Sequence, residues 1–533
     1  MSIDRLLVRS TRKMVVWAGT DVPNCAKVAF EARDLVVSQC TFEQLASGPF
    51  LAGVGAVVFT QDSGGADVLK GLIETHAPRL LNYGCTVIAR IIPDPVSDAS
   101  FRAGMYRANL PFGNLVVGTA ASTSASNQST EGDPPLPQVR FYGDTVGWES
   151  VANFIVSHPA GDAPDDNVTI EPKSMFTEEQ LLLLKRAFAG YAEVHLTKLD
   201  SGRSGAKALR ANARRHGITG GWVQPHFVKI GQRPAITIEY FNYDERVDPY
   251  IPFHLSPNIQ KERCCLGAKL GLLLGDYVDG SESLEACAKD SRAGHAIACL
   301  FDRTLRGWYK MATLDERVLS SMNEDFKLKR NFPKGRLELA RNIGAHHDLQ
   351  IMEKHLKQCS SKQWLRGPTH GDLHATNVRV RATDAIVIDF QAYSNGLVLR
   401  DIARLEVSLL VDGFRRSTYE DPTNATKFDG KGWLKDVEQL YLCDPTSNHP
   451  LDYEDPSSRA HWFHLCVRQV RLHARPFELG VGQYAAALGM ELLLKSARDE
   501  APPFEHYRRA ASYYLAERML EKVFPLPEAA KSA

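Results

Sequence analysis

The stretch from Gly367 to Arg404 has the sequence GPTHGDLHATNVRVRATDAIVIDFQAYSNGLVLRDIAR. Within it, Asp372 lies five residues before Asn377 in a short polar loop, and Asp389 follows the apolar run 385–388. Metal-assisted phosphoryl transfer needs one Asp to accept the proton of an attacking hydroxyl, an Asn to hold a metal ion, and another Asp to link a metal to nucleotide phosphates. Because Asp372, Asn377 and Asp389 occur in that order, the stretch predicts a catalytic centre of this kind.

The runs 370–374 (HGDLH) and 388–390 (IDF), together with Asn377, resemble the aminoglycoside phosphotransferase and choline-kinase-like branch of the protein-kinase-like fold. Protein kinases carry Arg where this chain has Gly371. The resemblance implies that Asp372 is the catalytic base and that Asn377 and Asp389 are metal ligands.

The run 399–403 (LRDIA) also resembles that branch, at the start of the helix after the metal-binding loop. There the Asp holds the catalytic loop in place, which gives Asp401 a structural role, and His370 supports the loop. Phe390 is followed by Gln391 where protein kinases have Gly, so the resemblance favours a small-molecule acceptor over a protein acceptor.

Other interpretations of these residues stay open. Asp and Asn also bond their own backbone in ordinary turns, and a related protein could bind nucleotide without transferring phosphate. His370 and His374 are four residues apart, but a zinc site would need a third ligand, and the sequence offers none nearby. Transfer of a nucleotidyl group is a further alternative.

The whole chain has 533 residues, which predicts two or three domains. Its 63 basic and 63 acidic residues cancel, so charge gives no indication of nucleic acid or an anionic membrane as a partner. The ten Cys form no CxxC pair, which is typical of buried thiols in a reducing compartment. No segment approaches the length of a membrane span. We therefore expect a soluble, cytoplasmic protein.

From Lys13 to about Pro159, short apolar runs alternate with helix-like segments, which predicts a parallel sheet covered by helices. The spacing resembles a flavodoxin-like or response-regulator receiver domain. Asp21 and Asp62 follow the first and third predicted strands, as residues of a receiver site would, although an Asp there is also a common turn or cap residue. The domain is expected to be a sensor or a docking module for a protein partner.

The segment 119–138 has few apolar side chains and is expected to be a surface loop. Pro, Gly and Asp then cluster in 158–172. The predicted division is an α/β domain at 1–160, a linker at 161–172 and an α+β kinase-like domain at 173–533. Its first lobe is expected at 173–275 and its helical lobe at 276–533.

The first lobe is expected to open with a helix capped by Thr177. A small-residue turn then lies between two predicted strands, where backbone N–H groups could approach phosphate oxygens. Most such turns are plain hairpins. The predicted phosphate-binding residues of this turn are Ser201, Gly202, Arg203, Ser204, Gly205 and Ala206.

Lys229 lies among apolar residues in the strand 226–231, where it needs a counter-charge, either a nucleotide phosphate or a carboxylate. The segment 236–250 is expected to be a helix, and Glu239 is the preferred partner of Lys229, with Glu245 as the competitor. The link between the lobes falls in 264–277, where an apolar strand and a core helix cannot be told apart.

The sequence thus predicts a phosphotransferase that uses ATP and Mg²⁺ and acts on a hydroxyl of a small molecule or a protein. The alternative is a nucleotide-binding regulator without catalysis, with the amino-terminal domain as its sensor. The acceptor cannot be identified, because variable helices and loops form its pocket.

Overall fold

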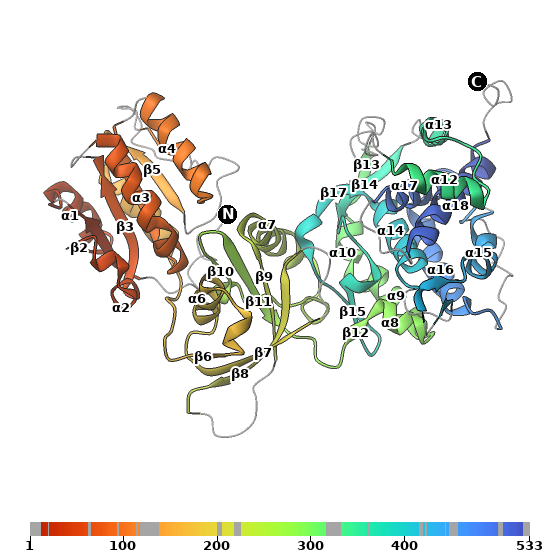
Figure 1. Ribbon diagram of the computed structural model, residues 1–533, viewed down its shortest axis with the longest axis horizontal. Helices are drawn as coiled ribbons and strands as arrows, with labels where there is room; N and C mark the ends of the chain where they lie inside the picture. Colours follow the sequence, from red (N-terminus) through yellow and green to blue (C-terminus); the bar gives the residue numbers. More distant parts are fainter. Residues whose placement is uncertain are drawn as a thin grey trace. The chain divides into compact units, whose positions relative to one another are not determined.

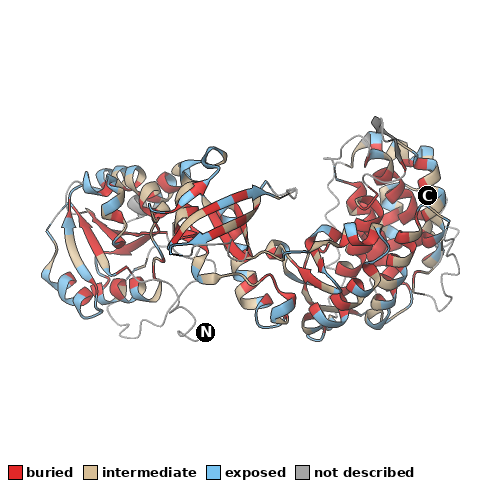
Figure 2. Cartoon of the chain, turned by 90° about the horizontal axis from the view of Figure 1, so that it is seen from below, coloured by how far each residue is buried: buried red, intermediate tan, exposed pale blue. Residues whose placement is uncertain are grey.

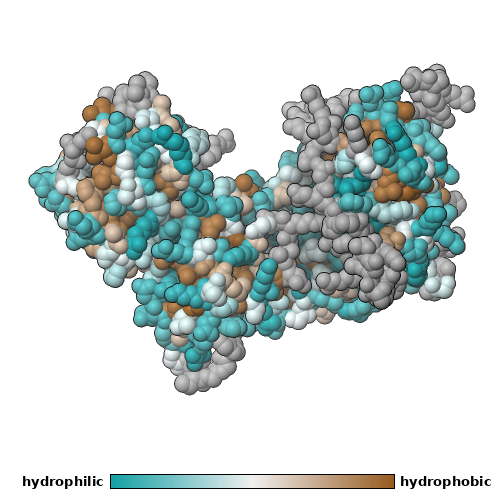
Figure 3. All heavy atoms as spheres, in the orientation of Figure 1, coloured by the Kyte–Doolittle hydropathy of each residue, from teal (hydrophilic) through white to brown (hydrophobic). Residues whose placement is uncertain are grey.

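The computed structural model describes residues 12–19, 21–61, 65–92, 95–112, 116–117, 138–199, 205–217, 225–315, 332–359, 363–414, 419–421, 424–442, 444–446, 457–498 and 505–525. The chain divides into two compact units, Met1–Phe241 with Asn258–Asp279, and Asn242–Pro257 with Gly280–Ala533. Hydrophilic residues cover much of the visible surface of each unit, with smaller hydrophobic areas among them (Figure 3). None of the described helices is long and apolar enough to cross a membrane.

The first unit begins with a parallel five-stranded sheet (Figure 1). Its strand order is β2-β1-β3-β4-β5, an order found in doubly wound α/β sheets. The strands are mostly apolar and each contains Val, as expected where helices cover both faces. They are β1 (Met14–Ala18), β2 (Val36–Cys40), β3 (Val54–Thr60), β4 (Thr86–Ile91) and β5 (Val139–Gly143). The helices are α1 (Asn24–Glu31), α2 (Gly48–Leu51), α3 (Gly65–Asn82), α4 (Pro95–Ala108) and α5 (Trp148–Ser157).

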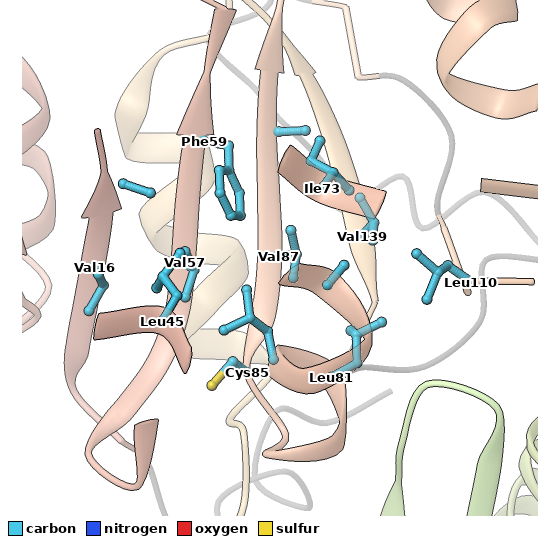
Figure 4. Close-up of a cluster of buried hydrophobic side chains, with 14 of the residues drawn as sticks. Val16, Leu45, Val57, Phe59, Ile73, Leu81, Cys85, Val87, Leu110 and Val139 are labelled. Carbon is cyan, nitrogen blue, oxygen red and sulfur yellow. The ribbon is translucent and has the colours of Figure 1, made fainter. Parts of the chain in front are cut away.

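Alternate residues of each strand enter two separate hydrophobic cores, because successive side chains point to opposite faces of a sheet. One core joins Val16, Val57 and Val87 to buried residues of α3 and α4 (Figure 4). The other joins their neighbours on the strands, such as Trp17 and Val58, to α1 and α5. The predicted parallel sheet covered by helices is therefore present.

The described residues of this part of the chain give no support to a receiver-like site. Asp21 is exposed before α1, whose N-cap residue is Pro23. Asp62 lies outside the described residues. The flavodoxin-like class stays a prediction.

A second, six-stranded sheet completes the first unit. Its order is β10-β11-β9-β8-β7-β6, antiparallel except for the parallel pair of β6 and β7. Helix α6 (Glu178–Ala187) carries the predicted cap, because Thr177 and Gln180 form a capping box. The strands are β6 (Thr169–Glu171), β7 (Tyr191–Lys198), β8 (Lys207–Arg215), β9 (His226–Gln232), β10 (Cys265–Leu266) and β11 (Leu270–Asp276).

Two predictions are refined here. Part of the predicted linker 161–172 is strand β6, which pairs with β7, while the domain boundaries themselves stay predictions. The segment 264–277, left open between strand and helix, forms β10 and β11, and β11 pairs with β9 along its whole length. Pairing with a partner distant in sequence decided its conformation.

The turn at residues 267–269 lies between β10 and β11 of the six-stranded sheet. It packs against the α/β part and so holds the two sheets of this unit together. Ala268 is 3 % exposed and packs in the hydrophobic core of the α/β part. Its backbone N–H donates to Asn82 Oδ1 at 2.8 Å. The buried guanidinium of Arg186 donates to the carbonyl oxygens of Asn82 at 3.3 Å and Leu266 at 2.8 Å. The α/β part therefore holds a turn of the six-stranded sheet.

The same turn fixes the start of helix α7 (Arg233–Asn242). Arg233 donates its backbone N–H to Lys269 O at 2.9 Å and its guanidinium to Gly267 O. Glu179 accepts the N–H of Lys269 at 2.8 Å. Burial lowers the pKa of Arg233 to about 9, and the charge of Arg186 adds to that effect.

The second unit is mainly helical, and its inner helices are buried on most sides (Figure 2). α14 packs against α16 and α17, and α17 against α18. The helices are α8 (Leu284–Lys289), α9 (Ala293–Cys299), α10 (Arg306–Tyr309), α12 (Lys334–Ile343), α13 (Leu349–Cys359), α14 (Val398–Val411), α15 (Gly430–Val437), α16 (His461–Ala474), α17 (Gln483–Ser496) and α18 (His506–Val523).

Three small sheets accompany these helices, and two of them frame the predicted catalytic loop. One has the order β12-β15-β16 and another β13-β14-β17. The loop runs from the end of β14 to the start of β15. The strands are β12 (Glu282–Ser283), β13 (Thr313–Asp315), β14 (Trp364–Thr369), β15 (Val378–Arg381), β16 (Asp384–Val387), β17 (Ser394–Leu397), β18 (Glu420–Asp421) and β19 (Asn424–Phe428).

We expect Arg186→Met to lower the free energy of unfolding of the first unit by about 2–4 kcal/mol, because it leaves several buried carbonyl oxygens without a charged donor. Urea denaturation followed by the fluorescence of the buried Trp17 measures this. Lys185→Met is the matched control, since its ion pair with the exposed Asp166 is worth about 1 kcal/mol at most. Equal losses in the two variants would contradict the structural role of Arg186.

Candidate active site

Asp401, buried on α14, holds the loop that follows β14. Its carboxylate accepts the backbone N–H of His370 at 2.5 Å and that of Gly371 at 3.0 Å. A buried carboxylate that receives two N–H donors fixes the position of both residues. This contact matches the structural role that the sequence resemblance gave Asp401.

His370 supports the loop from its other side. Its Nε2 donates to Ile388 O at 3.0 Å, and its Nδ1 accepts the backbone N–H of Asp372 at 3.3 Å. Together the two contacts select the neutral tautomer with the proton on Nε2. Since both ring nitrogens are occupied in the protein, His370 is unsuited to be a metal ligand.

Gly371 adopts a left-handed backbone with φ of +75°, in close contact with the chain after Asp389. A Cβ atom at this position would lie 1.9 Å from Ala392 O. Only glycine fits here without a shift of one of the two segments. Close packing against Ala392 therefore explains why this chain has glycine where protein kinases carry Arg.

Asp372 has a fixed backbone and an accessible carboxylate. Besides the N–H bond to His370, its carbonyl oxygen accepts from Asn377 Nδ2 at 3.1 Å. Its side chain is 42 % exposed, and its carboxylate oxygens lie 3.6 Å from His374 Nε2 and 4.0 Å from Arg404 Nη1. Both distances exceed a hydrogen bond, so the carboxylate can still accept a proton from another molecule.

Asn377 and Asp389 carry the oxygens that the sequence assigned to a metal. The amide nitrogen of Asn377 is used within the loop, which orients its Oδ1 away from that bond. Asp389 has φ of +68°, uncommon for a residue other than glycine and frequent at functional sites. Amide and carboxylate oxygens suit Mg²⁺, which usually takes one or two carboxylates together with water and phosphate. The residues present therefore fit such an ion.

No group of three or more His, Cys, Asp or Glu side chains within the described ranges is arranged to hold a metal ion by itself. A closed structural zinc site would require four such ligands. The zinc interpretation of His370 and His374 thus has no support among these residues.

The segment after Asp389 is held by the last residue of α7 and the residue that follows it. Asn242 Nδ2 donates to Phe390 O at 2.8 Å, and the ring of Tyr243 lies 6.2 Å from that of Phe390. Tyr243 opens a π-helical turn, Tyr243–Val247, a type of turn that is frequent at functional sites. The predicted helix 236–250 is therefore an α-helix that begins at Arg233 and changes to a π-helix before it ends.

Residues on one face of α14 contact successive residues of the loop. Asp401 bonds to His370 and Gly371, Arg404 lies near Asp372, and the Ser408 hydroxyl accepts the backbone N–H of Ala375 at 3.0 Å. These α14 residues are three and four apart, so they share a helix face. The sequence interpretation identified Asp401 and missed Arg404 and Ser408, although their spacing from Asp401 could have indicated them.

Glu491 of α17 was also missed, because nothing in its local sequence links it to the loop. It is 5 % exposed and binds Arg400 Nε at 2.7 Å and Arg404 Nε at 2.9 Å. Burial acts to raise the pKa of Glu491, but the two arginines outweigh burial and lower it. Burial also lowers the pKa of His374, with Asp372 opposing that shift, so the neutral imidazole is favoured near neutral pH.

In the first unit, Lys229 and Glu239 form a buried ion pair. Lys229 Nζ on β9 donates to Glu239 Oε2 on α7 at 2.7 Å, and the two side chains are 8 % and 7 % exposed. The competitor, Glu245, lies instead 3.8 Å from Arg246 Nη2. Because burying an isolated ammonium is costly, the pair explains how Lys229 stays charged.

The predicted phosphate-binding turn joins β7 to β8, which are antiparallel neighbours. Gly205 has φ of +70°, and Ala206 directly precedes β8. The other four predicted residues of this turn, 201–204, lie outside the described residues. The described site residues thus lie in two separate units: Gly205, Ala206, Lys229 and Glu239 in the first, and Asp372, Asn377 and Asp389 in the second.

One protein-family model matches this chain, that of Ternary complex associated domain 9, over residues 333–475. This stretch contains the loop and α14. It is a different family from the aminoglycoside phosphotransferase and choline-kinase-like branch that the motifs resemble. No curated protein matches the chain.

Several solved kinase structures are similar to the chain at low identity. The amicoumacin kinase hAmiN in complex with AMP-PNP, Ca²⁺ and Ami is 12 % identical, with 63 % of this chain and 91 % of that one covered and a TM-score of 0.35. A choline kinase from Cryptosporidium parvum Iowa II is 10 % identical, with 61 % and 90 % covered and a TM-score of 0.31. A glucosamine kinase in complex with glucosamine, ADP and inorganic phosphate is 12 % identical, with 66 % and 85 % covered and a TM-score of 0.35.

We expect Gly371→Ala to destabilise the second unit by about 2 kcal/mol or more, because a left-handed alanine costs about 1–2 kcal/mol and its Cβ also overlaps Ala392 O. Chemical denaturation measures this. The control is Gly335→Ala in α12, where no atom lies within 4 Å of the added Cβ. Alanine is the better helix former, so the control should gain up to about 1 kcal/mol. A neutral Gly371→Ala would disprove the close contact.

Proposed function

We propose that this chain is a phosphotransferase that uses ATP and Mg²⁺ to phosphorylate a hydroxyl group, built on a bilobal kinase-like domain at about 173–533. The observation that carries the proposal is the loop after β14. Its backbone is fixed by Asp401, His370 and Asn377, while the Asp372 carboxylate stays half exposed. A general base needs this combination of a rigid support and an open carboxylate.

In the proposed reaction, the acceptor oxygen attacks the γ-phosphorus of ATP and its proton passes to the Asp372 carboxylate. The bond between the γ-phosphorus and the β,γ-bridging oxygen breaks, and ADP leaves with that electron pair. Asn377 and Asp389 would hold Mg²⁺, which supplies compensation for phosphate charge when bound. Asp372 would thus be the proton acceptor, and Asn377 and Asp389 the metal ligands.

Lys229 and the turn at residues 201–206 are proposed to bind the nucleotide phosphates. The ion pair of Lys229 with Glu239 supports this role, because it keeps the ammonium charged and fixed in direction. Backbone N–H groups of a small-residue turn would add neutral donors to phosphate oxygens.

The acceptor is proposed to be a small molecule. Helix α14 begins at Val398, nine residues after Asp389, and the residues 394–397 between them form β17, which pairs with β14. The segment between Asp389 and α14 is therefore short and already paired, which leaves little chain for docking an extended peptide. A protein acceptor is the less favoured alternative.

A nucleotide-sensing regulator is the second candidate function, and one observation favours it. The turn at residues 267–269 connects the core of the amino-terminal α/β part to the start of α7, which carries Glu239. A protein partner bound to this flavodoxin-like part could then influence the Lys229–Glu239 pair. The role of the α/β part as a docking or sensor domain is part of this proposal.

The metal assignment predicts that Asp389→Asn weakens Mg²⁺-ATP binding at least tenfold, because a ligand charge is lost where phosphate charge must be balanced. Asn is the suitable replacement, since it tolerates the left-handed backbone. Isothermal titration calorimetry with and without Mg²⁺ measures the affinity. Asp384→Asn on β16 is the control and should leave it unchanged. If Asp389→Asn binds Mg²⁺-ATP as tightly as the unmodified protein, Asp389 is not a metal ligand.

The catalytic assignment predicts that Asp372→Asn keeps ATP affinity within a few-fold and lowers transfer on the order of 10² to 10⁴, as loss of a general base does. ATP consumption with pools of small hydroxylated metabolites measures the rate, and intact mass measures phosphorylation of the protein itself. If the variant keeps both the affinity and the cellular output of the chain, the regulator is the better description.

A further inference from the structure

Arg404 is held rigidly by a buried carboxylate. Its Nε and Nη2 donate to the two oxygens of Glu491 at 2.9 and 3.2 Å. A planar guanidinium bound through two nitrogens has a fixed direction. The third nitrogen, Nη1, lies 4.0 Å from Asp372 Oδ1. The α14–α17 contact thus places a fixed positive charge beside the proposed base.

The hydrogen bonds within the loop hold the backbone of Asp372 and not its side chain. His370 and Asn377 bind only the backbone N–H and carbonyl of Asp372. Two described basic groups face its carboxylate, His374 and Arg404. Burial favours neutral His374, so Arg404 is the permanent cation of the two. An interaction at 4 Å with a fixed cation favours one orientation of a half-exposed carboxylate.

We propose that Arg404, fixed by Glu491, is a positioning residue that orients the Asp372 carboxylate for proton transfer from the acceptor hydroxyl. This inference rests on the phosphotransferase proposed above. Arg404 acts through Asp372 and touches neither nucleotide nor acceptor. A base held within a small angular range reacts faster than one that rotates freely.

Arg400 provides a matched control within the same cluster. It binds the same Glu491 carboxylate, with Nε 2.7 Å from Oε1. Replacing either arginine leaves Glu491 with one cationic partner, but only Arg404 lies beside Asp372. A merely structural arginine pair predicts similar effects for both, whereas a positioning role predicts different ones.

The experiment measures Mg²⁺-dependent ATP hydrolysis by the full chain, with water as the acceptor. We expect Arg404→Met to lower kcat 10- to 100-fold, with KM for ATP changed less than threefold. Arg404→Lys should recover part of this loss. The kcat of the control, Arg400→Met, should stay within threefold of that of the unmodified protein. In the Asp372→Asn background, Arg404→Met should lower the rate no further, because residues that act as a unit are not additive. Equal losses for both arginines, or a further loss in that background, overturn the inference.

A second measurement does not depend on activity. The shift in urea midpoint caused by Arg404→Met should be smaller in the Asp372→Asn background, because the charge interaction is already absent there, while the shift caused by Arg400→Met stays the same. Additive shifts for Arg404→Met overturn the inference. If instead the unmodified protein and Asp372→Asn hydrolyse ATP equally, the proposed function fails, and the midpoint shifts still decide whether Arg404 and Asp372 interact.

Discussion

The carboxylate of Asp401, buried on α14, is the interaction on which the candidate site depends. It accepts the backbone N–H groups of His370 and Gly371 and so fixes the turn from β14 into the loop. A loop with buried backbone groups needs partners for them, and α14 supplies these partners at 401 and at 408. Because α14 packs on α16 and α17, the precision of the loop derives from the helical core beneath it.

Buried charges are satisfied in two ways, by ion pairs, as between Lys229 and Glu239 in the first unit, and by backbone carbonyl oxygens. In the second unit, Glu491 pairs with Arg400 and Arg404, and Glu406 pairs with Arg471. In the first unit, Arg186 and Arg233 instead donate to backbone carbonyl oxygens around residues 266–267. Arginine suits both uses, since its donors are rigid and its hydration is weak. The first arrangement places charge beside Asp372, and the second connects the α/β part to α7.

The loop motif could be recognised from the sequence because its residues lie close together in the chain, while their chemical roles stay predictions. Asp372 and Asn377 bond within five residues of each other, and the Thr177 cap involves a residue three positions away. The receiver-like interpretation of Asp21 and Asp62 found no support, since an Asp after a strand is as common in turns as in sites. Glu239 could be named as the partner of Lys229 because it lies on the predicted helix 236–250 that follows the strand, although Glu245 competed with it.

The sequence by itself determined the alternation of strands and helices at 13–159, the order of Asp372, Asn377 and Asp389, and the need of Lys229 for a counter-charge. Tertiary structure alone decided that 265–266 and 270–276 are strands, that Ala268 packs in the α/β core, and that Glu491 fixes Arg404 beside Asp372. The physical reason is the distance along the chain. Periodicity and short motifs report interactions between near neighbours, whereas packing partners such as Glu491, 87 residues from Arg404, are selected only when the core forms.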